Sequence, residues 1–297
     1  RYAVVEMGAN HPGEIAYLTT LAHPDVALVT NAAAAHLEGF GSLDGVARAK
    51  GEIFEGLGRE GVAVINGDDP YAPLWRRLAG GREVIQFGTG DGFEVSAAWE
   101  PTEGGAALSL RTPRGEFDVS LPLPGRHNVM NALAATAAAL AAGASREAVR
   151  AGLEAVRPVS GRMQFRRAHR GSGLIDDSYN ANRGSLASGL EVLAARPGRR
   201  LLVLGDMAEL GAGSEAMHRA AGERARALGI DGLYASGPLS RLAVEVFGGE
   251  AHHFDDTESL VAAIEPQLAP DVTVLVKGSR SARMERVTSA LADEGEG

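Results

Sequence analysis

The two lysines of this chain, Lys50 and Lys277, are its most informative candidate site residues. The chain has 297 residues with 29 lysine and arginine side chains in total, and all but these two are arginine. Lysine can change charge or take up carbon dioxide as a carbamate, whereas arginine keeps its proton in proteins. Each lysine lies in a dense polar segment, which favours a functional role over a surface lysine left by chance.

A first polar cluster comprises Glu6, Asn31, His36, Glu38 and Lys50. Glu6 and Asn31 each follow a predicted strand, His36 and Glu38 lie in the next loop, and Lys50 lies on the next predicted helix. A carboxylate and an imidazole suit a divalent cation, and Mg²⁺ prefers oxygen ligands that it shares with phosphates. A free ammonium would repel the metal, whereas a carbamate on Lys50 would offer an anionic oxygen. The alternatives are a loop histidine and a lysine on a helix surface.

A second cluster opens an alanine-rich predicted helix with the sequence Gly125-Arg126-His127-Asn128-Val129-Met130-Asn131. Backbone N–H groups at a helix start favour anions, and asparagine amides suit a base or a sugar. The alternative is an asparagine that only caps the helix.

A third cluster combines Arg162 with the segment Asp176-Asp177-Ser178-Tyr179-Asn180-Ala181-Asn182. Two acids followed by two amides at a strand end can bind a ribose, a base or a peptide backbone, and arginine can hold a phosphate. The alternative is turn chemistry, because aspartate and asparagine favour turns.

Two further clusters follow predicted strands near the C-terminus. One is Asp206-Met207-Ala208-Glu209-Leu210-Gly211 with His218, and the other is Lys277-Gly278-Ser279-Arg280. The cations beside Ser279 suit a carboxylate or a phosphate.

Short apolar runs that end in polar or glycine residues predict the sheet that positions the first clusters. The runs cover residues 2–5, 26–29 and 62–65, and helical segments at residues 12–21 and 42–57 separate them. Strand, polar loop and helix in succession indicate a parallel α/β sheet, which binds ligands at the carboxyl ends of its strands.

Between residues 83 and 124 the pattern changes to alternating strands with hairpin turns, which predicts a small antiparallel sheet. A helix is expected at residues 127–142, and Ser145 is a plausible N-cap for a second helix that ends near Val156.

The segment Arg157-Pro158-Val159-Ser160-Gly161 predicts a domain boundary, which gives domains at residues 1–157 and 158–297. Beyond it, strands are predicted at residues 173–176, 201–204, 232–235 and 272–276, with helices at 214–228 and 257–268. This half is expected to be a Rossmann-like doubly wound sheet. It lacks a G-x-G-x-x-G opening, so NAD is not predicted.

Composition narrows the function classes. The hydrophobic fraction is 45% and the net charge is −9, which argues against a generic nucleic-acid binder because such proteins are normally basic. The chain has no cysteine, so it forms neither disulfides nor thiolate metal sites. No apolar run reaches transmembrane length and no signal peptide leads the chain. We therefore expect a cytoplasmic α/β protein with no membrane insertion.

Five sequence motifs in order resemble the Mur ligase family over nearly the full chain. They are Glu6-Met7-Gly8-Ala9-Asn10, Thr30-Asn31 with His36-Leu37-Glu38-Gly39-Phe40-Gly41-Ser42, Asp177-Ser178-Tyr179-Asn180-Ala181-Asn182, Gly205-Asp206-Met207-Ala208-Glu209-Leu210-Gly211, and Lys277-Gly278-Ser279-Arg280. The third motif resembles the family member that adds D-alanyl-D-alanine, whereas the diaminopimelate- or lysine-adding member carries Asp-Asn-Pro-Arg, which is absent here.

The resemblance implies an α/β fold in which a partial P-loop-type central ATPase domain precedes a Rossmann-like C-terminal ligase domain. It implies an ATP-dependent acid–D-amino-acid ligase that adds D-alanyl-D-alanine to UDP-N-acetylmuramoyl-tripeptide through an acyl phosphate. ATP and Mg²⁺ would be its cofactors, and peptidoglycan synthesis its process. The implied Mg²⁺ ligands are Glu6, His36 and carbamylated Lys50, which would also be the catalytic residues.

The resemblance also implies the binding residues. Those for the nucleotide would be Asn31, Asn128, Asn131, Arg162 and Asp177. Those for the acceptor dipeptide would be Tyr179, Asn180, Asn182, Lys277, Ser279 and Arg280. The linker near Pro158 would let the C-terminal domain close and exclude water from the acyl phosphate.

One departure from the family is the absence of any Gly-Lys dipeptide, so the family's phosphate loop does not occur in this chain. We therefore expect a further segment before Arg1 and little activity from this chain alone. A smaller departure is Arg183, where the family usually has proline. Two alternatives stay open: another Mur or folylpolyglutamate-type ligase, and a non-catalytic binding protein that kept the sheet. The third residue of the tripeptide and the oligomeric state are not readable from the sequence.

Overall fold

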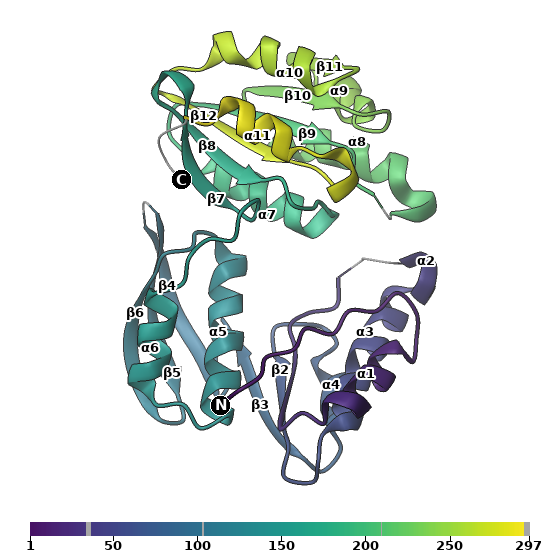
Figure 1. The fold of residues 1–297 in the computed structure, drawn as a ribbon, viewed down its shortest axis with the longest axis vertical. Helices are drawn as coiled ribbons and strands as arrows, with labels where there is room; N and C mark the ends of the chain where they lie inside the picture. Colours follow the sequence, from purple (N-terminus) through teal and green to yellow (C-terminus); the bar gives the residue numbers. More distant parts are fainter. Residues whose placement is uncertain (34–36, 103, 209, 294–297) are drawn as a thin grey trace. The chain divides into compact units, whose positions relative to one another are not determined.

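The computed structural model describes residues 1–33, 37–102, 104–208 and 210–293. The chain forms two compact units, Arg1–Arg157 and Pro158–Gly297. Each unit contains one six-stranded sheet (Figure 1), and the predicted α/β class is confirmed.

The sheet of the first unit has a parallel half and an antiparallel half. Its order is β1-β2-β3-β4-β5-β6. Strands β1 to β4 pair in parallel, and β4 to β6 pair antiparallel. The strands are β1 (Val26–Val29), β2 (Val62–Asn66), β3 (Glu83–Gly88), β4 (Val95–Thr102), β5 (Gly105–Thr112) and β6 (Gly115–Leu121). The antiparallel half was expected to begin at residue 83, but β3 belongs to the parallel half. The reason is that helix α4 (Ala72–Ala79) connects β2 to β3, and such a crossover joins parallel strands.

Helices lie on both faces of the sheet in this unit. They are α1 (Glu14–Ala22), α2 (Leu37–Phe40), α3 (Leu43–Gly51), α4 (Ala72–Ala79), α5 (Arg126–Ala141) and α6 (Arg146–Glu154). Successive residues of β2 point to opposite faces. Val64 packs in the cluster that contains the α5 residue Leu133, and Ile65 packs in the cluster that contains Trp75 of α4.

Two serines begin helices in this unit as the sequence predicted. The Ser42 side chain accepts a hydrogen bond from the Gly45 N–H at 3.0 Å, and Ser145 accepts one from the Ala148 N–H at 3.2 Å. The helix that starts after Ser42 is shorter than expected, because it ends at Gly51 and continues as a 3₁₀ turn over Glu52–Gly56.

The expected buried strand at residues 2–5 is wrong in this structure. The segment has no regular secondary structure, and the exposed fractions of Tyr2, Val4 and Val5 are 83%, 99% and 63%. A strand forms only where its backbone finds a hydrogen-bonding neighbour. The described sheet begins at β1, and no strand pairs with residues 2–5.

The sheet of the second unit is parallel except at one edge. Its order is β11-β10-β9-β12-β8-β7, and only β7 pairs antiparallel. The strands are β7 (Gln164–Ala168), β8 (Ser172–Asp177), β9 (Arg199–Gly205), β10 (Gly232–Ser236), β11 (Glu250–Phe254) and β12 (Val272–Lys277). The carboxyl ends of β8, β9, β10 and β12 therefore meet at one edge of the sheet.

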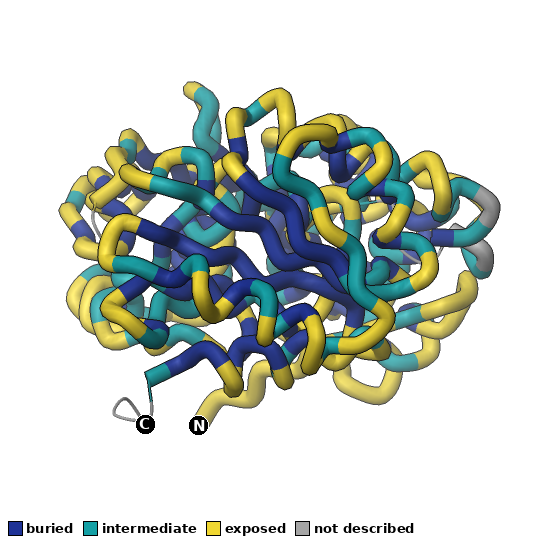
Figure 2. Tube along the Cα trace, turned by 90° about the horizontal axis from the view of Figure 1, so that it is seen from above, coloured by how far each residue is buried: buried dark blue, intermediate teal, exposed yellow. Residues whose placement is uncertain are grey.

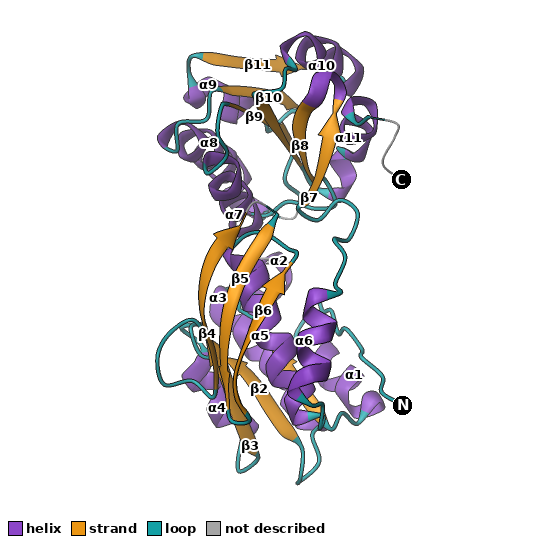
Figure 3. Ribbon diagram, turned by 90° about the vertical axis from the view of Figure 1, so that its left-hand side faces the viewer, coloured by secondary structure: helices purple, strands orange, loops and turns teal. Residues whose placement is uncertain are grey.

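Helices flank both sides of this second sheet, as Figure 3 shows. They are α7 (Arg183–Ala194), α8 (Ser214–Ala227), α9 (Arg241–Phe247), α10 (Thr257–Ile264) and α11 (Glu285–Leu291). On β9, Leu202 packs in the cluster with α7, α8 and α9 residues, and Val203 packs in the cluster with α10 and α11 residues. This is the doubly wound arrangement that the sequence predicted.

Strands β2, β9, β10 and β12 are largely buried, and buried stretches of strand are dark blue in the tube of Figure 2. In the described part of the chain, no helix is both long and apolar enough to cross a membrane.

Candidate active site

Lys50 lies near the carboxyl ends of the parallel strands of the first unit. Helix α3 carries it in its last turn. Its Nζ donates a hydrogen bond to the Asn31 carbonyl, which follows β1, at 2.7 Å. Burial lowers the pKa of Lys50, and the Asp69 carboxylate partly opposes this by raising it. A lysine with a lowered pKa is more often in its neutral amine form, and only the neutral amine can take up carbon dioxide.

Asn66, the last residue of β2, and Asp69 in the loop after it fix the segment that carries Asn31. The Asn66 amide donates to the Thr30 carbonyl at 2.7 Å. The Asp69 carboxylate accepts from the Ala32 N–H at 2.8 Å and from the Tyr71 N–H at 2.9 Å. Neither residue was among the predicted site residues. The signal that could have found them was the polar run from Asn66 to Asp69 directly after a buried strand.

The structure brings together only part of the predicted metal cluster. Glu6 lies on the exposed segment that forms no strand, and His36 lies outside the described residues. Lys50 as an ammonium donates to a carbonyl and is no metal ligand in that form. Within the described ranges, no group of three or more histidine, aspartate or glutamate side chains could hold a metal. The described residues therefore place Lys50 beside Asn31 but form no metal cluster by themselves.

The start of helix α5 is organised differently from the asparagine cap considered above. Gly125 is the N-cap, with a φ of 92° that favours glycine. Asn128 folds back instead, and its amide donates to the Pro124 carbonyl at 2.8 Å. The Asn131 amide lies at 3.5 Å from the Asn128 Oδ1. Asn128 is half-buried and Asn131 is exposed, so Asn131 has the freer side chain.

An acid–hydroxyl–guanidinium contact connects three neighbouring segments of the first unit. Asp68, after β2, accepts from the N–H and the hydroxyl of Thr89, both at 2.8 Å. Arg126, at the start of α5, donates to the Thr89 hydroxyl at 3.0 Å. The loops after β2 and β3 are thereby fixed against the helix that carries Asn128 and Asn131.

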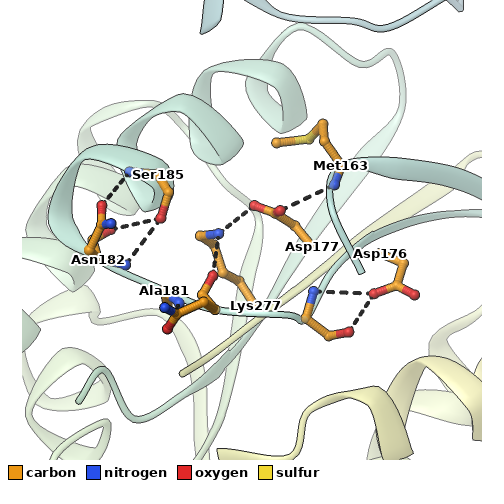
Figure 4. Close-up of polar contacts among 9 residues, drawn as sticks. Met163, Asp176, Asp177, Ala181, Asn182, Ser185 and Lys277 are labelled. Atoms are coloured by element: carbon orange, nitrogen blue, oxygen red, sulfur yellow. Dashed lines mark hydrogen bonds and ion pairs between the residues drawn. The ribbon is translucent and has the colours of Figure 1, made fainter. Parts of the chain in front are cut away.

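In the second unit, Asp177 and Lys277 form a buried ion pair between the ends of β8 and β12 (Figure 4). Lys277 is 1% exposed, and its Nζ also donates to the Asn180 carbonyl at 3.0 Å. The other Asp177 oxygen accepts from the Met163 N–H at 3.1 Å. Burial lowers the pKa of Lys277, and the Asp177 charge raises it in part. The ammonium of Lys277 therefore faces protein groups.

The loop after β8 uses its own polar side chains. Asp176 accepts from the Ser178 hydroxyl at 2.6 Å. Asn182 caps α7, because its side chain accepts from the Ser185 N–H at 2.9 Å while the Ser185 hydroxyl accepts from the Asn182 N–H at 3.0 Å. Figure 4 shows this reciprocal pair. The Asn180 Oδ1 accepts from the Ala181 N–H at 2.8 Å. The turn chemistry considered as an alternative for this segment is therefore present.

Tyr179 is an exposed residue of this loop, as is Asn180, and it lies near two guanidinium groups. Its exposed fraction is 43%. The Arg162 guanidinium carbon lies 4.4 Å from the ring centroid, and that of Arg280 lies 5.7 Å from it, which are cation–π distances. The Tyr179 N–H donates to the Gly161 carbonyl at 2.9 Å, which places Arg162 beside the ring. The three side chains present an aromatic and cationic surface that suits an anion.

The predicted residues after β12 separate into buried and exposed groups. Ser279 is 1% exposed, and its hydroxyl lies 3.0 Å from the Ser281 hydroxyl. Arg280 is exposed. Of Lys277, Ser279 and Arg280, only Arg280 presents its side chain to solvent.

The two units, each built on one sheet with polar residues at the carboxyl ends of its parallel strands, define a two-domain α/β protein. Residues 1–139 match the Mur ligase middle domain, and residues 161–280 match the Mur ligase, glutamate ligase domain. The chain belongs to the Mur ligase family.

Among relatives, the chain is 48% identical to the UDP-N-acetylmuramoyl-tripeptide–D-alanyl-D-alanine ligase of Escherichia coli (strain K12), over 99% of the chain and 66% of that protein. It is similar to the crystal structure of MurF from Acinetobacter baumannii, with a TM-score of 0.90 and 35% identity over 97% of the chain and 64% of the other. It also matches MurF ligase from Thermotoga maritima in complex with ADP, with a TM-score of 0.85 and 29% identity over 96% of the chain and 65% of the other. The chain thus spans just under two thirds of the length of these proteins.

Proposed function

We propose that this chain supplies ATP- and acceptor-binding domains to a ligase that joins D-alanyl-D-alanine to UDP-N-acetylmuramoyl-tripeptide in peptidoglycan synthesis. The observation that carries this proposal is the 48% identity to the Escherichia coli ligase over 99% of the chain. That match includes the ends of β8 and β12 and the loops after them, where the candidate acceptor residues lie.

The proposed reaction has two steps. The C-terminal carboxylate of the tripeptide attacks the γ-phosphorus of ATP, the bond to the ADP oxygen breaks, and an acyl phosphate forms. The amine of D-alanyl-D-alanine then attacks the acyl carbon, loses a proton, and expels phosphate from the tetrahedral intermediate as the amide forms. Phosphoryl transfer depends mainly on positioning and charge neutralisation, which are tasks for fixed loops.

The proposed nucleotide-binding residues are Asn31, Asn128, Asn131, Arg162 and Asp177. Asn31 lies on a segment fixed by Asn66 and Asp69. Asn131 is exposed at the start of α5 and suits the donors and acceptors of a base. Arg162 carries a charge suited to phosphate.

The proposed Mg²⁺ ligands are Glu6, His36 and Lys50 as a carbamate. The donor types support this proposal, because a carbamate and a carboxylate are hard oxygen donors. When bound, Mg²⁺ would neutralise charge on the transferring phosphoryl group. The role of the chain's own residues is to hold Lys50 beside Asn31 at the sheet edge.

The proposed acceptor-binding residues divide by exposure. Tyr179 and Arg280 would contact the dipeptide, whose carboxylate suits a guanidinium. Lys277, Asn182 and Ser279 are buried or half-buried and would shape the pocket, because their polar groups bond within the protein. Asn180 is exposed but would also shape the pocket, since its Oδ1 and its carbonyl accept hydrogen bonds from Ala181 and Lys277. The proposal includes a cytoplasmic location, because the donor substrate is linked to a nucleotide, and neither nucleic acid nor membrane insertion is part of it.

The test is ATP-dependent phosphate release by the full gene product, with UDP-N-acetylmuramoyl-tripeptide and a panel of amine acceptors. We expect release to require D-alanyl-D-alanine, and we expect Lys50→Ala to abolish it. Release with D-glutamate, diaminopimelate, lysine or glutamate instead would favour the other-ligase alternative. Nucleotide binding without any turnover would favour the binding-protein alternative, and unchanged turnover in Lys50→Ala would contradict the metal proposal.

A further inference from the structure

The segment Gly205-Asp206-Met207 stands at the carboxyl end of β9, between the chain segments that follow β10 and β12. Strand β9 pairs in parallel with β12 on one side and with β10 on the other. The residues that follow β9 are therefore next to those that follow β12, which include Ser279 and Arg280. The proposed function gives this segment no role.

Asp206 bonds to both neighbouring loops. Its backbone carbonyl accepts from the Ser279 N–H at 2.8 Å. Its carboxylate accepts from the Ser240 N–H at 2.7 Å and from the Leu239 N–H at 3.1 Å. One residue thus connects the loop after β10 to the loop after β12.

The glycines around Asp206 show that this connection is closely packed. Gly237 has a φ of 129°, and a Cβ there would lie 2.4 Å from the Asp206 Oδ1, so only glycine leaves room for the carboxylate. A Cβ on Gly278 would lie 3.1 Å from the Gly205 Cα. The chain after β12 therefore lies directly against the chain after β9.

His218 fixes the far side of the same segment. Its ring is fully buried, and its Nε2 accepts from the Met207 N–H at 2.9 Å. Because a backbone N–H only donates, Nδ1 carries the ring proton and donates to the Ser214 carbonyl at 2.7 Å. Helix α8 thereby holds the peptide that follows Asp206.

We propose that Asp206 is a positioning residue that sets the place of the Ser279–Arg280 segment, and through it the affinity for the amine acceptor and its carboxylate. Ser279 is buried and bonded to Asp206, whereas Arg280 is exposed beside Tyr179. A shift of Ser279 therefore moves the Arg280 guanidinium relative to that ring. This inference rests on the proposed function.

The test is steady-state kinetics of the full gene product with Asp206→Ala, in which the KM for D-alanyl-D-alanine and the KM for ATP are measured separately. We expect the acceptor KM to rise about tenfold and the ATP KM to change less than about twofold. Without its carboxylate, residue 206 loses its hydrogen bonds to the Leu239 and Ser240 N–H groups, so the backbone carbonyl that holds the Ser279 N–H loses its anchor. Asp206→Asn keeps an acceptor oxygen for the Ser240 N–H and is expected to stay within about threefold of the wild-type acceptor KM. If Asp206→Ala does not fold, Asp206→Ser takes its place with an expected rise of about fivefold.

Asp256→Ala is the matched control. Asp256 caps α10 by accepting from the Ser259 N–H at 2.7 Å, and it follows β11, which β10 and β9 separate from β12. Its loss is expected to lower the melting temperature without changing the acceptor KM.

An acceptor KM that stays within twofold in Asp206→Ala, or an equal rise in Asp256→Ala or in the ATP KM, would overturn the positioning role. A wild-type protein that does not use D-alanyl-D-alanine would instead contradict the proposed function, and this inference with it.

Discussion

At the scale of single residues, Lys50 combines the features that a carbamate-forming lysine needs. Burial lowers its pKa, and a hydrogen bond of 2.7 Å to the Asn31 carbonyl fixes its amine. Arginine at this position would keep the positive charge but could not form a carbamate.

We therefore predict that Lys50→Arg lowers the ligation rate of the full gene product by about 100-fold or more, because loss of a metal ligand costs at least as much as loss of its outer-shell partners. Arg48→Lys is the control, since Arg48 is exposed on the same helix and pairs with Asp44. Its turnover is expected to remain near that of the wild type. Equal turnover in both variants would show that Lys50 acts only as a cation.

The two lysines show how far sequence reasoning reaches at this scale. Both were predicted as site residues from their rarity and their polar surroundings. The sequence could not show that Lys277 is buried, because its partner Asp177 lies 100 residues earlier in the chain. It likewise could not show that Asp69, 37 residues from Ala32, fixes the Asn31 segment.

At the scale of elements, three adjacent strands share one charged cluster. Glu250 on β11 accepts from the Tyr234 hydroxyl of β10 at 2.6 Å and from the Arg199 guanidinium of β9 at 2.5 Å. The Tyr234 hydrogen bond and the Arg199 charge hold the pKa of Glu250 below its ordinary value of 4.5. Burial and the Glu250 carboxylate raise the pKa of Tyr234 to about 12.

The lowered pKa of Glu250 gives a prediction with a definite sign. The stabilisation is present above pH 4.5 and is lost as the pH falls through the lower value of the folded state. Glu250→Gln is expected to lower the free energy of unfolding by about 1 kcal/mol at pH 7, discounted for partial exposure. The difference from the wild type should shrink in denaturation curves below pH 4.

Glu245→Gln provides the control for that experiment, because Glu245 pairs with Arg219 on the exposed surface. Its effect should stay below about 0.5 kcal/mol. A pH-independent loss in Glu250→Gln would contradict the electrostatic explanation.

Helices α8 and α9 pack closely because Gly222 has no side chain. A Cβ there would lie 2.2 Å from the Ala243 carbonyl oxygen. Gly222→Ala should therefore destabilise the second unit by about 2–3 kcal/mol, in spite of the better helix propensity of alanine. Gly184→Ala on α7 meets only ordinary contacts and should be neutral or stabilise by up to about 1 kcal/mol. Equal melting temperatures for the two variants would contradict the packing argument.

The elements that the sequence predicted best have both an apolar pattern and turn or capping residues at their ends. Strands β1 and β2 and the helices that Ser42 and Ser145 cap are of this kind. Strands β7 and β11 were missed because their sequences, Gln164-Phe165-Arg166-Arg167-Ala168 and Glu250-Ala251-His252-His253-Phe254, are polar, as suits edge strands. The strand predicted at residues 2–5 was wrong for the opposite reason. An apolar run predicts burial, but it does not supply a neighbouring strand for backbone hydrogen bonds.

At the scale of the whole molecule, the two units have separate cores. The chain's two tryptophans, Trp75 and Trp99, both lie in the first unit, and Trp75 is fully buried. Tryptophan fluorescence therefore reports on the first unit, whereas far-UV circular dichroism reports on both.

We predict that the two probes give different denaturation transitions, because each unit unfolds around its own core. A fragment of residues 158–297 should fold alone. Its denaturation transition should match the transition that circular dichroism detects in the whole chain and tryptophan fluorescence does not. An unfolded fragment would contradict this independence.

Mass spectrometry of the product formed by the full gene product would identify its amine acceptor directly. The reaction would contain ATP, UDP-N-acetylmuramoyl-tripeptide and an equimolar mixture of D-alanyl-D-alanine, D-glutamate, diaminopimelate and lysine. We expect one product, with the mass of the tripeptide substrate plus D-alanyl-D-alanine minus one water, formed together with ADP. A product that contains another acceptor would contradict this assignment. The absence of any product from a protein that binds ATP would contradict it as well.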